Sequence, residues 1–179
     1  MKAILKTIKN CKNDIPESVI PLFEHIVDSY NGDECEHHFM MAMEEHLTKE
    51  QRFRIYEKHG SCKGAKYDKG RVEFALKHAH LPLSERFKVF TETYGWKAVL
   101  NEDNTITVNF KCGHGYYLHA PKGKFKWLAS VETYFERCAG GRLYELEKAL
   151  GIKLKIKSVD VSPLKENIVN PVVFTFEVV

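Results

Sequence analysis

Residues 96–111 read WKAVLNEDNTITVNFK, and this stretch decides the fold class. Apolar and polar residues alternate on both sides of a polar loop, residues 101–104, which is the period of half-buried β-strands. The stretch therefore predicts a β-hairpin made of residues 96–100 and 105–111. Further along the chain, residues 153–161 and 171–179 alternate in the same way and predict a second hairpin.

The first half of the chain has helical periodicity instead. Thr48 and Gln51 form a capping box that predicts a helix ending at His59-Gly60, where the glycine is expected in the left-handed conformation. Ser84 is expected to cap a later helix, Glu85–Tyr94. Between the two hairpins, residues 138–141 (CAGG) are expected to open a helix over Arg142–Leu150.

These patterns together predict one α+β domain over residues 1–179, with a helical part at 1–95 and an α+β part at 96–179. An N-terminal helical layer is expected to pack with a four-stranded antiparallel sheet in the order ββ-α-ββ. A chain of this length can bury a core without disulfide or metal crosslinks.

The composition sets limits on the function. Hydrophobic residues make up 44% and charged residues 28%, which is typical of a folded globular protein. The net charge of the chain is only +3, and lysines and arginines are interspersed with aspartates and glutamates. A nucleic-acid partner is therefore not indicated. No apolar run approaches the roughly 18 residues of a membrane span, and Met1–Lys6 lacks signal-peptide character, so we expect a cytoplasmic protein with reduced cysteines.

Three cysteines are expected at turns or element ends beside glycine: Cys62, Cys112 and Cys138. Such placement suits a ligating or reactive thiol, which needs access, better than a packed core cysteine. With His59 and His114 they offer the N and S ligands of a tetrahedral zinc site, although the spacing matches no standard zinc motif. Alternatively, Cys112 and His114 point into the sheet core, and His59 only interacts with a helix dipole.

Cys138 is the preferred nucleophile, because a thiol that precedes a helix is stabilised as a thiolate by the helix dipole. His114 or His59 would act as its base. Arg137 and Arg142 would lower its pKa or bind a substrate carboxylate, and Tyr116 belongs to an aromatic segment suited to a pocket wall. The alternative is a small residue placed where Gly140 and Gly141 let the helix pack closely.

Two segments, residues 111–114 (KCGH) and 138–144 (CAGGRLY), resemble microbial proteins related to the 4-vinyl reductase domain and the amino-thiazoline carboxylate hydrolases. Residues 59–62 (HGSC) are similar to their upstream cysteine motif. The resemblance covers roughly residues 96–179 and implies a small-ligand or metal-binding α+β unit. The chain departs from it in the closing hairpin, which has Glu166-Asn167 and Val172-Val173-Phe174 in place of a Gly-Asp turn and a further cysteine.

Three functions follow from these observations. The first is a small-molecule-binding or hydrolase-like protein with a convergent Cys/His site that holds zinc. The second is a metal-free cysteine-nucleophile enzyme, and the third is a non-catalytic ligand-sensing or interaction domain. The expected partner is a small molecule, without nucleic acid or membrane, and a homodimer stays open.

Overall fold

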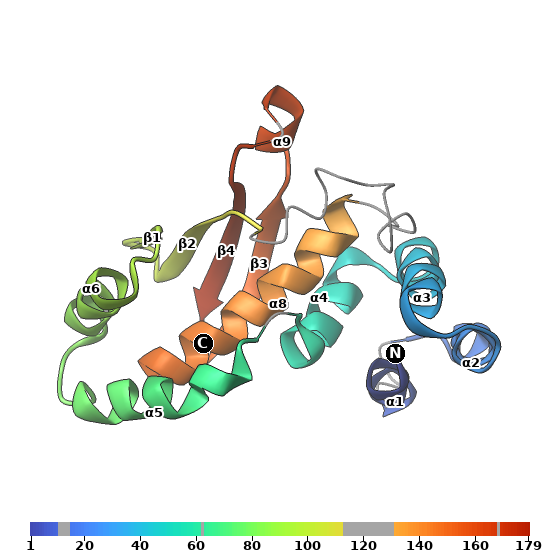
Figure 1. Cartoon of the computed structure of the whole chain (residues 1–179), viewed down its shortest axis with the longest axis horizontal. Coiled ribbons are helices and arrows are strands. Elements are labelled where there is room, and N and C mark those ends of the chain that lie inside the picture. The colour runs from blue at the N-terminus through green and yellow to red at the C-terminus, as the bar shows by residue number, and fades with distance from the viewer. Residues whose placement is uncertain (11–14, 62, 113–130, 168) are drawn as a thin grey trace.

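The computed structural model describes residues 1–10, 15–61, 63–112, 131–167 and 169–179. At its centre is the four-stranded antiparallel sheet that the sequence predicts (Figure 1). The strands β1 (Ala98–Leu100), β2 (Thr105–Phe110), β3 (Leu154–Asp160) and β4 (Val172–Val178) lie in the order β1-β2-β4-β3. Alternate residues of β2 and β4 are buried, which confirms the period of two: Ile106, Val108, Val172, Phe174 and Phe176.

One long helix, α8 (Val131–Leu150), crosses the sheet and packs on β3 and β4 (Figure 1). The prediction that a helix begins only after Gly141 is wrong, because residues 138–141 are helical and lie inside α8. A glycine inside a helix costs about 1 kcal/mol relative to alanine. Tertiary packing therefore has to compensate for the glycine pair.

That packing comes from α4 (Lys49–His59), which lies against α8 at van der Waals contact between backbones. A Cβ atom on Gly140 would lie 2.0 Å from the carbonyl oxygen of Tyr56, and one on Gly60 would lie 2.0 Å from the carbonyl carbon of Gly140. Gly60 has φ −56°, so the left-handed conformation expected there is wrong. The two glycines are needed for the close approach of the helices.

The predicted capping box at the start of α4 is present. Gln51 N–H donates to Thr48 Oγ1 at 3.3 Å, and the backbone N–H of Thr48 donates to Gln51 Oε1 at 2.8 Å. Ser84, in contrast, is not a cap, because α6 (Leu83–Tyr94) begins before it with Pro82 at the N-cap. The turn between β1 and β2, Asn101–Asn104, ends with Asn104, which has a positive φ of 57°.

The remaining helices fit the predicted single helical layer only in part. Helices α4, α5 (Asp68–Lys77) and α6 contact α8, with η2 (Ala65–Tyr67) leading into α5. Helices α1 (Lys2–Asn10), α2 (Ile20–Ser29, after η1, Glu17–Val19) and α3 (Gly32–His46) lie beyond α4, away from the sheet (Figure 1). The short α9 (Pro163–Glu166) also separates β3 from β4, so the expected ββ-α-ββ order is not fully matched. In the described part of the chain, no helix combines the length and apolar content that crossing a membrane requires.

Strand β3 forms one edge of the sheet, and α4 covers part of it. The backbone N–H of Ile156 donates to Glu57 Oε1 of α4 at 2.9 Å, and a register irregularity follows between Ile156 and Ser158. Burial raises the pKa of Glu57. A side-chain carboxylate thus takes the place that a neighbouring strand would occupy.

Candidate functional site

One face of α8 carries the candidate chemistry. Tyr134, Cys138 and Arg142 are spaced four residues apart, which places them on the same side of the helix. The end of β2 runs beside this face. Phe110 lies with its ring centre 5.4 Å from the Arg142 guanidinium carbon, and the Sγ atom of Cys112 lies 3.0 Å from the Oη atom of Tyr134. Helix and strand therefore align a strip of thiols, rings and one arginine.

Cys112, Tyr134 and Cys138 form what we call the thiol cluster. Burial raises the pKa of Tyr134, and the neighbouring thiols of Cys138 and Cys112 raise it further, so the phenol stays protonated near neutral pH. Cys138 is 1% exposed and Cys112 is 9% exposed. Ser61 Oγ lies 3.8 Å from Cys138 Sγ and closes the cluster on the side of α4. Cys112 and Cys138, which are 26 residues apart in the sequence, thus both interact with the Tyr134 hydroxyl.

The position of Cys138 corrects one part of its expected role. Only the first four N–H groups of a helix lack intrahelical partners, and Cys138 lies in the interior of α8. The helix dipole therefore cannot lower the pKa of its thiol as the sequence analysis expected. Its close neighbour Gly140 does let α8 pack tightly on α4, in line with that part of the alternative interpretation.

His59 ends α4 and contacts the N-terminal helix. Its Nε2 atom lies 2.5 Å from Thr7 Oγ1 of α1. Burial lowers the pKa of His59, and the positive charges of Lys63 and Lys58 lower it further. The ring is therefore neutral near pH 7, as a ligand or base would have to be.

Three of the predicted site residues, Cys62, His114 and Tyr116, lie outside the described residues. Within the described ranges, no three His, Cys, Asp or Glu side chains are grouped so that they could hold a metal ion. His59, Cys112 and Cys138 consequently do not make a metal site by themselves. The five-residue zinc set stays a prediction.

The two arginines that flank Cys138 in the sequence face different surroundings. Arg137 forms an ion pair with Glu36 and so ties α8 to α3. Arg142 Nη1 lies 2.7 Å from Glu145 Oε2, and its guanidinium carbon lies 5.7 Å from the Trp96 ring centre. Arg142 also lines a hollow whose described lining does not include Arg137.

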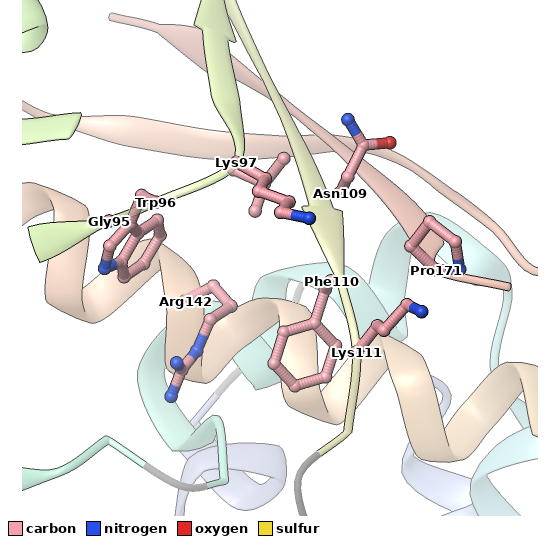
Figure 2. A pocket seen from close by; sticks show the side chains of 9 residues that line it. Gly95, Trp96, Lys97, Asn109, Phe110, Lys111, Arg142 and Pro171 are labelled. Atoms are coloured by element: carbon pink, nitrogen blue, oxygen red, sulfur yellow. The ribbon is translucent and has the colours of Figure 1, made fainter. Parts of the chain in front are cut away.

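This hollow, which we call the basic hollow, has a volume of about 520 Å³. Figure 2 shows Arg142 between the rings of Trp96 and Phe110 at its wall. Lys97 and Lys111 bring two more positive charges, and none of the described lining residues is acidic. Concave surfaces with aromatic walls and a few polar groups are typical of small-molecule sites.

Sequence reasoning missed Trp96, Lys97, Phe110 and Lys111 as site residues. They begin and end the first hairpin, and its antiparallel register brings these ends together: Asn109 N–H donates to the Lys97 carbonyl at 2.9 Å. The pairing of the two strands could have shown that two lysines and two rings meet there. The sequence could not show that Arg142 lies opposite.

Glu145 connects Arg142 to a second arginine. Arg71 also binds this carboxylate, while its Nη1 atom donates to Asp68 Oδ1 at 3.1 Å and to the Lys63 carbonyl at 2.9 Å. Burial raises the pKa of Glu145, and the two arginines oppose that shift. The Glu145 carboxylate thus forms ion pairs with both Arg71 and Arg142.

Comparison with known proteins gave no match to a family model, a curated protein or a solved structure. The resemblance to the 4-vinyl reductase domain and the amino-thiazoline carboxylate hydrolases therefore stays a prediction. The function has to be argued from the geometry of the site.

Proposed function

We propose that the chain binds small organic anions and that the ligand occupies the basic hollow. One observation carries the proposal: Lys97, Lys111 and Arg142 line a hollow of about 520 Å³ together with two aromatic rings, without an acidic residue among its described lining. A carboxylate or phosphate there would meet Arg142, which is also paired with Glu145, in the field of Lys97 and Lys111. A cation would be repelled.

The surroundings of Arg142 suit this role. A guanidinium presents its N–H groups in a planar fork that matches a carboxylate, and it stacks well on aromatic rings. The rings of Trp96 and Phe110 lie within 6 Å of Arg142 and restrict its side chain. A restricted side chain loses less conformational entropy when a ligand binds.

The thiol cluster lies on the same face of α8 and extends the proposal to chemistry. Cys112 and Cys138, joined by Cys62 and His114, would supply the N and S ligands that zinc prefers. Zinc there would polarise a carbonyl group of the bound anion, which is the hydrolase-like form of the proposal. Metal analysis of protein purified without chelators is the test. Absence of bound metal, together with unchanged folding and binding in Cys112→Ser, would remove this form.

A non-catalytic sensor is the second candidate, and the burial of the thiols favours it. Cys138 is 1% exposed, and its helix-interior position gives no dipole to activate it as a metal-free nucleophile. In a sensor, Cys112→Ser and Cys138→Ser would both keep the affinity for the anion. In a zinc-dependent enzyme they would lose turnover or metal.

Calorimetric titration with benzoate tests the anion site directly. We expect Arg142→Gln to weaken benzoate binding about tenfold, because a charge-assisted hydrogen bond contributes roughly 1.5–3 kcal/mol. Arg137→Gln is the matched control, since Arg137 pairs with Glu36 and does not line the hollow. Equal affinity of the wild type and Arg142→Gln, with both folded by circular dichroism, would contradict the proposal.

A further inference from the structure

A second hollow also has Trp96 in its wall. It has a volume of about 440 Å³ and is built by η2, α5, α6 and Trp96, the second residue after α6. We call it the aromatic hollow, because four rings line it: Tyr67, Phe90, Tyr94 and Trp96. Its described lining includes none of the cysteines and histidines predicted to bind zinc, and none of the residues predicted to bind a ligand.

The rings of the aromatic hollow are arranged around Phe90. Its ring centre lies 5.2 Å from that of Tyr94 and 5.2 Å from that of Trp96. Tyr67 and Tyr94 remain 58% and 43% exposed. Exposed rings gathered around a hollow are typical of a site that covers its apolar surface with a ligand.

The charges differ between the two hollows. Lys66 and Arg71 line the aromatic hollow. Lys66 Nζ lies 4.9 Å from the Tyr67 ring centre, and the charge of Arg71 is balanced by Asp68 and Glu145. The basic hollow has three cations and no acidic residue in its described lining, and one of the three, Arg142, shares Glu145 with Arg71. An anionic group is therefore favoured in the basic hollow, and an uncharged planar group in the aromatic one.

Trp96 connects the two hollows, since it lines both. Arg142 stacks on this ring at 5.7 Å, and Phe90 also contacts it. Arg71, from the lining of the aromatic hollow, and Arg142, from that of the basic hollow, share Glu145. A ligand held by its acid group at Arg142 could continue past Trp96 without leaving an apolar wall.

We infer that the ligand is an extended aryl acid, whose anionic group binds in the basic hollow and whose planar apolar part passes Trp96 into the aromatic hollow. This inference rests on the proposed function, because it assigns the substrate class of the same site. Stacking on aromatic rings and burial of apolar surface would supply the added affinity.

Gly70 offers a way to close the aromatic hollow without disturbing its walls. It lines the hollow within α5, and a Cβ atom built on it meets nothing within 4 Å. Gly70→Phe would fill the hollow, while Gly70→Ala adds a single methyl group and is the matched control. Tyr94→Ala removes one exposed wall and gives a second, independent variant.

The probes are benzoate, which spans the basic hollow alone, and biphenyl-4-carboxylate, which reaches past Trp96. For the wild type and Gly70→Ala, we expect calorimetry to give about tenfold tighter binding of the biphenyl acid. Gly70→Phe should remove this advantage and leave benzoate binding unchanged. Tyr94→Ala should reduce the advantage severalfold.

The outcomes separate the two claims. If Gly70→Phe and Tyr94→Ala leave biphenyl-4-carboxylate binding unchanged, the inference is overturned while the anion site stands. Equal weakening of both acids by Gly70→Phe would also overturn it, because the loss would not depend on the second ring. If neither acid binds to the wild type, the proposed function itself fails.

Discussion

Two glutamates of α8, Glu136 and Glu145, are buried and bind arginines, but their arginines have different surroundings. Arg52 binds Glu136 through two N–H groups at 2.7 and 2.9 Å and a third donates to the Leu47 carbonyl at 3.0 Å, with Glu136 fully buried. Arg142 shares Glu145 with Arg71 and lies beside the basic hollow. The comparison teaches that residue type alone does not identify a ligand-binding arginine. A ligand-binding arginine is identified by the open space beside it and by the number of cations that share its carboxylate.

The largest expected effect separates the two pairs by stability. Glu136→Gln should lower the free energy of unfolding by about 3 kcal/mol, because it leaves a buried guanidinium without its counter-charge. Glu145→Gln should cost less, about 1 kcal/mol, since Arg71 keeps Asp68 and two carbonyls. Urea unfolding of both variants at neutral pH measures the difference. Equal losses would show that the second pair is as structural as the first.

The next effect tests the close packing of α8 on α4 at Gly140. Gly140→Ala should lower the free energy of unfolding by about 2 kcal/mol, because its Cβ atom would lie 2.0 Å from the Tyr56 carbonyl oxygen and push α4 away. Gly70→Ala, on the open side, should instead stabilise the protein by about 0.5 kcal/mol through helix propensity. The sign of the two shifts in denaturation midpoint is the readout. Stabilisation by Gly140→Ala would contradict the close packing.

The smallest expected effect concerns pH and His59. Since the fold lowers the pKa of His59, the unfolded chain takes up the proton first as the pH falls below about 6.5. Acidification should therefore destabilise the wild type through this residue, whereas above that pH both states are neutral and the effect vanishes. Melting temperatures from about pH 7.5 to about pH 5.5 should fall less steeply in His59→Gln. Parallel slopes would mean that His59 is not held neutral by burial.

Local signals were enough to predict several elements. The alternation in residues 96–111 and in the two late strands gave the antiparallel sheet, and Thr48 with Gln51 gave the start of α4, because these features depend on neighbours within a few residues. The glycine pair at 140–141 misled the prediction of α8. Its helix is stabilised by the distant backbone of Tyr56 and Gly60, which no local pattern reveals.

The candidate site was less accessible from sequence. Placement beside glycine drew attention to Cys112 and Cys138, and the structure brings both to Tyr134, but their turn positions did not hold for Cys138. Arg142 was singled out for its position beside Cys138, whereas its relevance comes from Trp96 and Phe110 on another element. Such contacts follow from the crossing of helix and sheet.

The carboxylate of Glu57 on the free edge of β3 has a consequence for self-association. Open strand edges recruit other chains and lead to aggregation unless they are protected. Here an incoming strand would have to displace Glu57 from the Ile156 N–H and fit the irregular register that follows. Addition of a strand from another copy is thereby opposed at this point of the edge.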